Sequence, residues 1–236
     1  MSEPLVLLAG MMCDARVFLP QIVDLSLDHA VTIIPLTQGE RIEEIASAIL
    51  TAAPAKFALC GHDMGGVVAM ELARRAPDRI TRLALMNCTP LADTPPVAVM
   101  RDEQIIKARA GRLQDALTQD VNAMGLAEGP AKVHVHQGLI EMGMDLGPEL
   151  YVRQTRVLQK RRDQQATLRQ LRMPTLVMCG AEDQVTPIKR HEFVAELIPY
   201  ARLQVIDGAG HVPQLEAPDA TNAALRTWMR QPLVLR

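Results

Sequence analysis

The chain has 236 residues, of which 48% are hydrophobic and 22% are charged, and its formal net charge is -2. This length is enough for one domain with a full hydrophobic core. The near-balanced charge, without any block of like charges, excludes a nucleic-acid groove or an anionic membrane surface as the expected partner. No segment approaches the ~20 apolar residues of a membrane span. Because the N-terminus also lacks the basic region of a signal peptide, we expect a cytoplasmic protein.

Short apolar runs alternate with amphipathic helical segments along the chain. The first run, at 4–9, is continuously apolar and ends at Gly10, as expected for a strand buried on both faces. The next predicted elements are, in order, a helix at about 15–26, a strand at 30–35, a helix at 40–52, a strand at 56–60, a helix at 67–75 and a strand at 82–86. The last part of the chain adds strands at 175–179 and 202–206 and helices at about 188–198 and 219–230. This alternation predicts a three-layer α/β fold with a mostly parallel sheet of about six strands.

The stretch from 95 to 171 differs from the rest because its segments are helical, with charged faces, and none is a convincing strand. An insertion of this length before the fifth strand is too long for an ordinary connection. We therefore predict a helical cap at 95–171, inserted in a core made of residues 1–94 and 172–236. A cap in this place would cover the carboxyl ends of the strands, where open α/β sheets bind their ligands.

A glycine-rich motif, Gly61-His62-Asp63-Met64-Gly65-Gly66, lies between the third predicted strand and the helix after it. The flanking glycines permit a sharp turn, which exposes the side chain of Asp63 beside the positive end of that helix. Taken alone, the motif fits a nucleophile at Asp63 as well as it fits an Asp that caps the helix.

Two later segments favour the nucleophile. Residues 180–187 (GAEDQVTP) follow the fifth strand and contain Asp183, and residues 208–211 (GAGH) follow the sixth strand and end in His211. Both lie just past carboxyl ends of strands, on the same edge as Asp63. A buried carboxylate can hold one imidazole nitrogen while the other nitrogen faces the reaction centre. The sequence therefore predicts a catalytic group of Asp63, Asp183 and His211.

With these motifs the chain resembles the α/β-hydrolase fold superfamily from end to end. Its loop at 8–12 and its compact cap look like those of the small esterase- and lactonase-type hydrolases. The resemblance implies an oxyanion hole formed by the backbone N–H groups of Met11 and Met64. It also places the acid at Asp183, the commoner position, while Asp93 is the alternative because some members with an Asp nucleophile place the acid after the fourth strand.

Most similar chains carry serine where this chain has Asp63. An ionised carboxylate attacks directly and is suited to displacing a leaving group from an sp³ carbon, which forms an ester of the enzyme itself. His211 would then activate water against that ester. Within the superfamily, an Asp at this position resembles epoxide hydrolases and haloalkane or haloacetate dehalogenases. The chain departs from both: Met64 stands where those dehalogenases have Trp or Arg, and the cap has one tyrosine, Tyr151, where those epoxide hydrolases use two.

Three hypotheses follow. The first is a small-molecule hydrolase that forms a covalent intermediate on Asp63 with an epoxide, a halide or an activated ester. The second is an esterase- or lactonase-type carboxylic ester hydrolase in which Asp63 replaces serine, by divergence or substitution, and leaves low activity. The third is a non-enzymatic receptor for small ligands, against which the intact histidine and acid argue.

Two further residues are candidates for substrate binding. Tyr151 is the cap residue expected to contact the substrate. His62 could also touch it, although in similar chains this residue supports the elbow through hydrogen bonds. The expected partner is a small-molecule substrate, and both a monomer and a homodimer fit the sequence.

Metal and cofactor sites are not expected, because no nucleotide loop, metal cluster or prosthetic-group motif occurs. His134 and His136 alternate like two ligands on one strand face, but without a carboxylate or cysteine at metal spacing a solvated or packed pair is favoured. The cysteines also lack metal-ligand spacing, and we expect reduced, packed thiols at Cys13, Cys60, Cys88 and Cys179.

Overall fold

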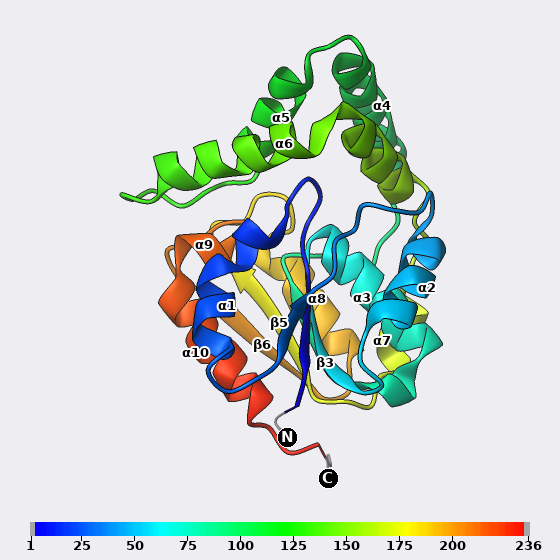
Figure 1. Cartoon of the computed structure of the whole chain (residues 1–236), viewed down its shortest axis with the longest axis vertical. Coiled ribbons are helices and arrows are strands. Elements are labelled where there is room, and N and C mark those ends of the chain that lie inside the picture. Colours follow the sequence, from blue (N-terminus) through cyan, green and yellow to red (C-terminus); the bar gives the residue numbers. More distant parts are fainter. Residues whose placement is uncertain (1–2, 234–236) are drawn as a thin grey trace.

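Six strands form one sheet at the centre of the computed structural model, which describes residues 3–233 (Figure 1). The strands are β1 (Leu5–Leu8), β2 (Val31–Ile33), β3 (Phe57–His62), β4 (Ile80–Met86), β5 (Thr175–Gly180) and β6 (Ala201–Ile206). Their order across the sheet is β2-β1-β3-β4-β5-β6, and every pairing is parallel. The predicted three-layer α/β fold is confirmed, and all strands end at the same edge of the sheet.

Helices cover both faces of this sheet. One face packs against α2 (Ile42–Ala52), α3 (Met64–Arg75) and α8 (Ile188–Leu197), and the other against α1 (Leu19–Leu25) and α10 (Pro218–Met229). Successive side chains of β1 enter the two cores in turn and are completely buried. Because a central parallel strand is buried on both faces, its sequence is continuously apolar rather than alternating. The short helices of the core are η1 (Ala15–Phe18), η2 (Pro77–Arg79) and α9 (Pro213–Glu216).

Three helices lie over the carboxyl edge of the strands and form the arm at the top of Figure 1. They are α4 (Pro95–Arg109), α5 (Leu113–Asn122) and α6 (Lys132–Gln159), which is kinked at Gly147, where φ is +84°. Their own small core contains buried side chains such as Leu117 and Tyr151. By contrast, α7 (Gln165–Gln170) packs against α3 and α8, because Leu168 is fully buried in the core of the sheet. The division into a core and a cap at 95–171 stays a prediction. Helix α7 falls within this range but lies in the layer of core helices.

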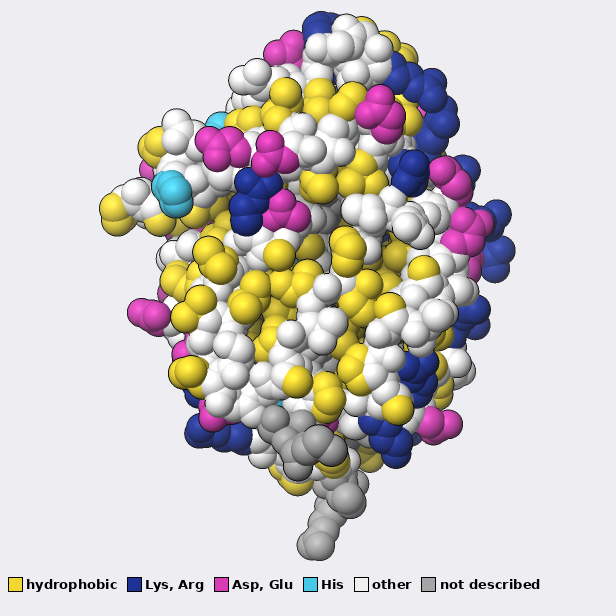
Figure 2. All heavy atoms as spheres, in the orientation of Figure 1, with side chains coloured by type: hydrophobic (Ala, Val, Ile, Leu, Met, Phe, Trp, Pro, Cys, Tyr) yellow, Lys and Arg dark blue, Asp and Glu magenta, His cyan; other side chains and the backbone are white. Residues whose placement is uncertain are grey.

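The surface carries charges of both signs. On the face shown in Figure 2, the area below the cap is mostly hydrophobic or uncharged in its centre, and charged side chains lie around it and across the cap. None of the helices within residues 3–233 is long and apolar enough to cross a membrane. Met1 and Ser2 belong to the N-terminal segment whose lack of a basic region underlies the expected location, and they lie outside the described residues.

Candidate active site

Asp63 occupies the sharp turn between β3 and α3. Its backbone has φ +48° and ψ -115°, a combination that a residue other than glycine adopts only when the surrounding structure enforces it. The glycines around it are required by close packing. A Cβ atom on Gly65 would lie 2.2 Å from the carbonyl oxygen of Leu8, and one on Gly61 would lie 2.3 Å from the carbonyl oxygen of Gly65. The turn therefore holds the Asp63 side chain at the carboxyl edge of the sheet.

Asp63, Asp183 and His211 come together at this edge. The Nδ1 atom of His211 lies 3.0 Å from each carboxylate oxygen of Asp183. Its Nε2 atom lies 3.9 Å from Oδ1 of Asp63. Because Asp183 engages one ring nitrogen, the other is free to act on a group bound at Asp63.

The carboxylate of Asp183 is fully buried and accepts hydrogen bonds from several donors. Asn87 Nδ2 and Thr186 Oγ1 each donate to Oδ2 at 2.7 Å, and the backbone amides of Val185 and Thr186 donate to Oδ1 at 2.8 and 3.0 Å. Burial by itself would raise the pKa of Asp183, but the hydrogen bond and charge of His211 and the bonds from Thr186 outweigh it and hold the pKa well below its usual range. Asp183 is therefore an ionised, rigidly held partner.

Asp93, the alternative partner for His211, has other neighbours. Its buried carboxylate binds Nε of Arg101 at 2.6 Å and Nη2 of Arg161 at 2.8 Å. These contacts connect the segment before α4 to α4 itself and to the residues just after α6. Arg161 is accordingly part of a buried ion pair.

The ionisation states of Asp63 and His211 are linked. Burial would raise the pKa of Asp63, but the charges of His211 and His62 and the amides of Met11 and Met64 lower it. Burial would lower the pKa of His211, but the hydrogen bond and charge of Asp183 and the charge of Asp63 raise it. The arrangement therefore favours the ionised form of Asp63 and makes His211 a stronger base.

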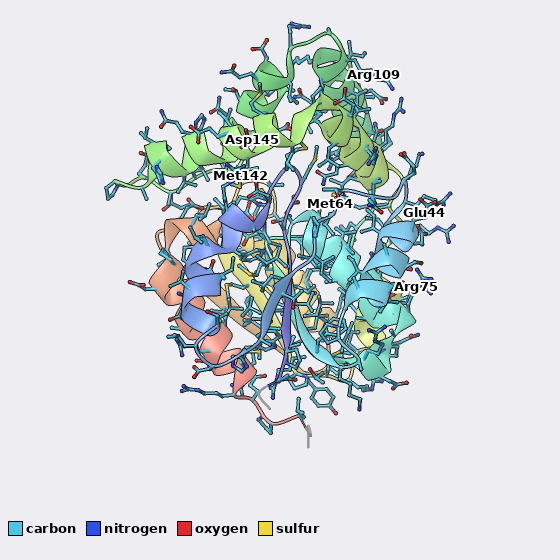
Figure 3. The ribbon with its side chains drawn as sticks, in the orientation of Figure 1. Glu44, Met64, Arg75, Arg109, Met142 and Asp145 are labelled. Atoms are coloured by element: carbon cyan, nitrogen blue, oxygen red, sulfur yellow. The ribbon has the colours of Figure 1, made fainter. Side chains whose placement is uncertain are left out.

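The two amides expected to form an oxyanion hole lie beside Asp63. The N–H of Met11 donates to Oδ2 of Asp63 at 2.9 Å. Met64 is the first residue of α3, and Figure 3 labels it on the side of the core that faces the cap. The loop that carries Met11 is held by the cap, because the amide of Met12 donates to Oε1 of Gln154 at 2.8 Å and Nε2 of Gln154 donates to the carbonyl of Leu36 at 3.0 Å.

A cavity of about 190 Å³ lies between core and cap. Asp63, His211 and Met11 line it from the core side, and Tyr151 lines it from the cap. Apolar side chains form most of the wall, including those of Met12, Met100, Leu117, Val121, Met124, Leu139, Leu158 and Val185. The cavity is therefore an apolar pocket with a carboxylate and an imidazole at one end, which is the usual composition of a small-molecule site.

The remaining candidate residues have different positions. His62 does not line the cavity. Its buried ring donates from Nε2 to the carbonyl of His211 at 2.8 Å, and burial lowers its pKa to about 4. This is the supporting position rather than a contact with the substrate. Cys13 lines the cavity, but burial raises the pKa of its thiol, which keeps it protonated.

The interpretation of His134 and His136 as neighbours on one strand face is wrong, because both lie in helix α6. Residues two apart on a helix point to different sides. Within residues 3–233, no group of three or more His, Cys, Asp or Glu side chains could hold a metal ion.

Several supporting residues are not apparent from the sequence motifs. Asn87 follows β4 at the shared edge, has φ +45°, and binds Asp183. Glu216 accepts the amides of Gly210 and Val212, both beside His211, at 3.0 Å each. The position of Asn87 directly after a strand is the one signal that could have revealed it, because the carboxyl ends of parallel strands meet at one edge.

Comparison with known proteins is consistent with this geometry. The sequence model of the alpha/beta hydrolase family matches residues 6–224. The chain is 27% identical over 190 residues to the pimeloyl-[acyl-carrier protein] methyl ester esterase of Nitrosomonas europaea, covering 76% of this chain and 74% of that protein. It is 25% identical over 183 residues to 3-oxoadipate enol-lactonase 2 of Acinetobacter baylyi, covering 73% and 63%.

Solved structures show the same fold. The enol-lactonase from Burkholderia xenovorans LB400 superimposes with a TM-score of 0.86 at 23% identity, covering 98% of this chain and 93% of that one. A thermophilic esterase from Thermogutta terrifontis gives a TM-score of 0.84 at 24% identity, covering 98% and 90%. The fold, the pocket at the carboxyl edge of the sheet and the family match over nearly the whole chain lead to one conclusion: the chain belongs to the alpha/beta hydrolase family and is a hydrolase.

Proposed function

We propose that this hydrolase works through a covalent ester on Asp63, with His211 and Asp183 activating the water that hydrolyses it. The observation that carries the proposal is the hydrogen bond from the Met11 amide to Oδ2 of Asp63. This contact supports the proposal because Oδ2 would become the ester carbonyl oxygen, and the Met11 amide would be one donor of the proposed oxyanion hole. The other oxygen, Oδ1, lies toward Nε2 of His211 and is the atom that attacks.

In the first step, Oδ1 of Asp63 attacks an sp³ carbon of the substrate. A carbon–oxygen bond forms and the bond to the leaving group breaks. Its electron pair departs with a halide ion, or remains on the oxygen of an opened epoxide, which takes a proton from water. The nucleophile needs no base at this stage because Asp63 is ionised. The product is an alkyl ester whose carbonyl oxygen is Oδ2.

In the second step, water attacks Cγ of this ester and gives its proton to Nε2 of His211. Negative charge develops on Oδ2, which the Met11 amide already contacts, so no rearrangement is needed to stabilise it. The intermediate then collapses, the alcohol departs with the proton from His211, and Asp63 is left as a carboxylic acid, which releases its proton to solvent and becomes a carboxylate again. Asp183 fixes the ring and stabilises the imidazolium that forms.

A second candidate is a carboxylic ester hydrolase in which Asp63 replaces the usual serine. The names of the relatives, methyl ester esterase and enol-lactonase, favour it. Two features oppose it. Oδ2 of Asp63 occupies the position that the carbonyl oxygen of an ester would need at the Met11 amide. Attack of a carboxylate on an ester carbonyl also produces an anhydride, which is a poor route.

The proposal is tested by intact-protein mass spectrometry of a His211→Gln variant with a panel of epoxides, haloalkanoates and activated esters. Without the base, hydrolysis stops and the covalent ester accumulates. The expected result is an added mass on the peptide that contains Asp63, whose size identifies the substrate class. His191→Gln is the matched control, because His191 is buried beside the Pro187 carbonyl and does not line the cavity.

An unmodified spectrum across the panel would reject the covalent mechanism. The ester-hydrolase candidate then predicts that Asp63→Ser gains esterase activity, because serine with His211 and Asp183 would complete a conventional acyl-transfer site.

A further inference from the structure

The end of the cavity formed by the cap is polar, unlike its apolar wall. Asp120 of α5, Gln104 of α4 and Tyr151 of α6 all line it. The hydroxyl of Tyr151 donates to Oδ2 of Asp120 at 2.6 Å. Among residues 3–233, no donor bonds to Oδ1, the other oxygen of this carboxylate. Asp120 therefore has one oxygen available to a molecule bound in the cavity.

Gln104 is the second group of this end. The residue is only 3% exposed, and its Oε1 atom is buried without a hydrogen-bond partner among the described residues. Other buried glutamines, such as Gln21 and Gln164, also have an unpaired oxygen, but Gln104 lines the cavity. Gln119, which lines the same cavity, differs because Lys107 donates to its side chain. The unpaired oxygen of Gln104 is therefore an acceptor for a ligand group bound at this end.

The charges around the cavity limit what that group can be. The acidic side chains in the wall are Asp63 and Asp120, and the one Lys or Arg among the described wall residues is Arg101. Arg101 is already engaged, with its Nε 2.6 Å from Asp93. Burial also raises the pKa of Asp120, although the hydrogen bond from Tyr151 opposes this, so the carboxylate lacks full compensation. A carboxylate on the substrate would meet acidic groups at both ends of the pocket.

We propose that Asp120, Gln104 and Tyr151 form a recognition subsite for a hydrogen-bond donor of the substrate, a hydroxyl or an ammonium group. The unpaired oxygens of Asp120 and Gln104 accept from this group, and the apolar wall between the subsite and Asp63 holds a short hydrocarbon part. The subsite concerns binding at the cap end, and only the orientation of the reacting carbon toward Asp63 depends on the function proposed above. The substrate is thus an apolar molecule with an alcohol or amine at one end, and not a carboxylate.

The subsite is tested by isothermal titration calorimetry of the full chain with unreactive ligands of equal length: pentylammonium, 1-pentanol and pentanoate. Pentylammonium is expected to bind at least tenfold more tightly than pentanoate, because a hydrogen bond to a charged group contributes about 1.5–3 kcal/mol. Asp120→Asn keeps the shape and removes the charge, and it should weaken pentylammonium about tenfold while changing 1-pentanol by less than threefold. Binding of 1-pentanol without preference for pentylammonium would assign the subsite to hydroxyl groups.

Asp115→Asn is the matched control. Asp115 is exposed on the same helix, and its replacement by Asn changes the net charge by the same amount as Asp120→Asn. It should leave all three affinities unchanged. The proposal is overturned if pentanoate binds as tightly as the other two ligands, or if Asp120→Asn and Asp115→Asn have equal effects. These ligands form no covalent bond. If no adduct forms on Asp63 but the ligand preference is found, only the proposed chemistry at Asp63 is rejected. If the adduct forms but the ligand preference is not found, only the subsite is rejected.

Discussion

At the scale of single residues, the proposed mechanism makes hydrolysis of an ester on Asp63 depend on the pKa of His211. Burial lowers this pKa, while Asp183 and the charge of Asp63 raise it above its usual value in the free enzyme; in the ester, Asp63 is uncharged and Asp183 alone remains of these two. The imidazole must be neutral to accept a proton from water, so the hydrolysis rate should rise with pH through a midpoint at the pKa that His211 has in the ester. Measuring the decay of the covalent adduct by rapid quench between pH 5 and 9 checks this.

Asp183→Asn should move that midpoint downward, because the charge that raises the pKa of His211 is removed. The maximal rate should fall by about 10²–10⁴-fold, since the ring loses its orienting partner. Asp207→Asn is the control, because Asp207 is exposed in the turn that follows β6. A midpoint that stays in place in the Asp183 variant would show that another group limits hydrolysis.

Asn87 acts on the same histidine through Asp183, to which its Nδ2 donates at 2.7 Å. Replacing it by glycine preserves the positive φ of +45° at no steric cost and deletes the side-chain amide, which donates to Asp183 and to the carbonyl oxygen of Gly210. We expect hydrolysis about 10-fold slower or more, as for other partners that orient a functional side chain, and a loss of about 1–3 kcal/mol in the free energy of unfolding. Steady-state kinetics and urea denaturation measure the two effects, and an unchanged rate would remove Asn87 from the site.

At the scale of elements, the elbow depends on the close approach of α3 to β1. A methyl group on Gly65 would lie 2.2 Å from the carbonyl oxygen of Leu8, so Gly65→Ala must separate the helix from the strand. We expect a loss of about 1–3 kcal/mol or more in the free energy of unfolding by urea. Gly138→Ala in α6 is the control. A methyl group there meets no atom within 4 Å and should be neutral or stabilise the helix by about 0.5–1 kcal/mol. Equal effects of the two substitutions would contradict this explanation.

The elements themselves could largely be predicted from the sequence, and the reason is local. The inner strands of the parallel sheet are buried on both faces, so they appear as largely apolar runs, as at Leu5–Leu8, whereas the edge strands β2 and β6 are only partly buried. The positions of Asp63, Asp183 and His211 could be predicted because each follows a strand, and all strands end at one edge. Helix α3 begins at Met64, three residues before the predicted start, because the glycines that mark the turn are themselves helical.

What the sequence does not show depends on packing between distant segments. Asp120 and Gln104 lie on two cap helices, and only the folding of the cap brings them into one cavity. The same applies to Arg161, whose partner Asp93 is distant in the chain.

At the scale of the whole molecule, Glu216 connects the cap to the loop of His211. Its Oε1 accepts the amide of Ala127, which lies between α5 and α6, at 2.7 Å. Its Oε2 accepts the amides of Gly210 and Val212, the residues on either side of His211, at 3.0 Å each. One half-buried carboxylate therefore connects the segment between α5 and α6 to the loop of His211.

Glu216→Ala removes the acceptor of three amides at once. We expect faster hydrogen exchange in two segments that are distant in sequence, 124–127 and 208–212, because amides that lose a buried partner become accessible through local opening. The turnover rate should fall as well, since His211 loses its support while Asp183 is untouched. Glu196→Ala, at an exposed position on α8, should change neither exchange nor turnover. If exchange increased only at 208–212, Glu216 would support the histidine loop alone. The cap would then be held to the core by other contacts, such as the hydrogen bonds of Gln154 to Met12 and Leu36.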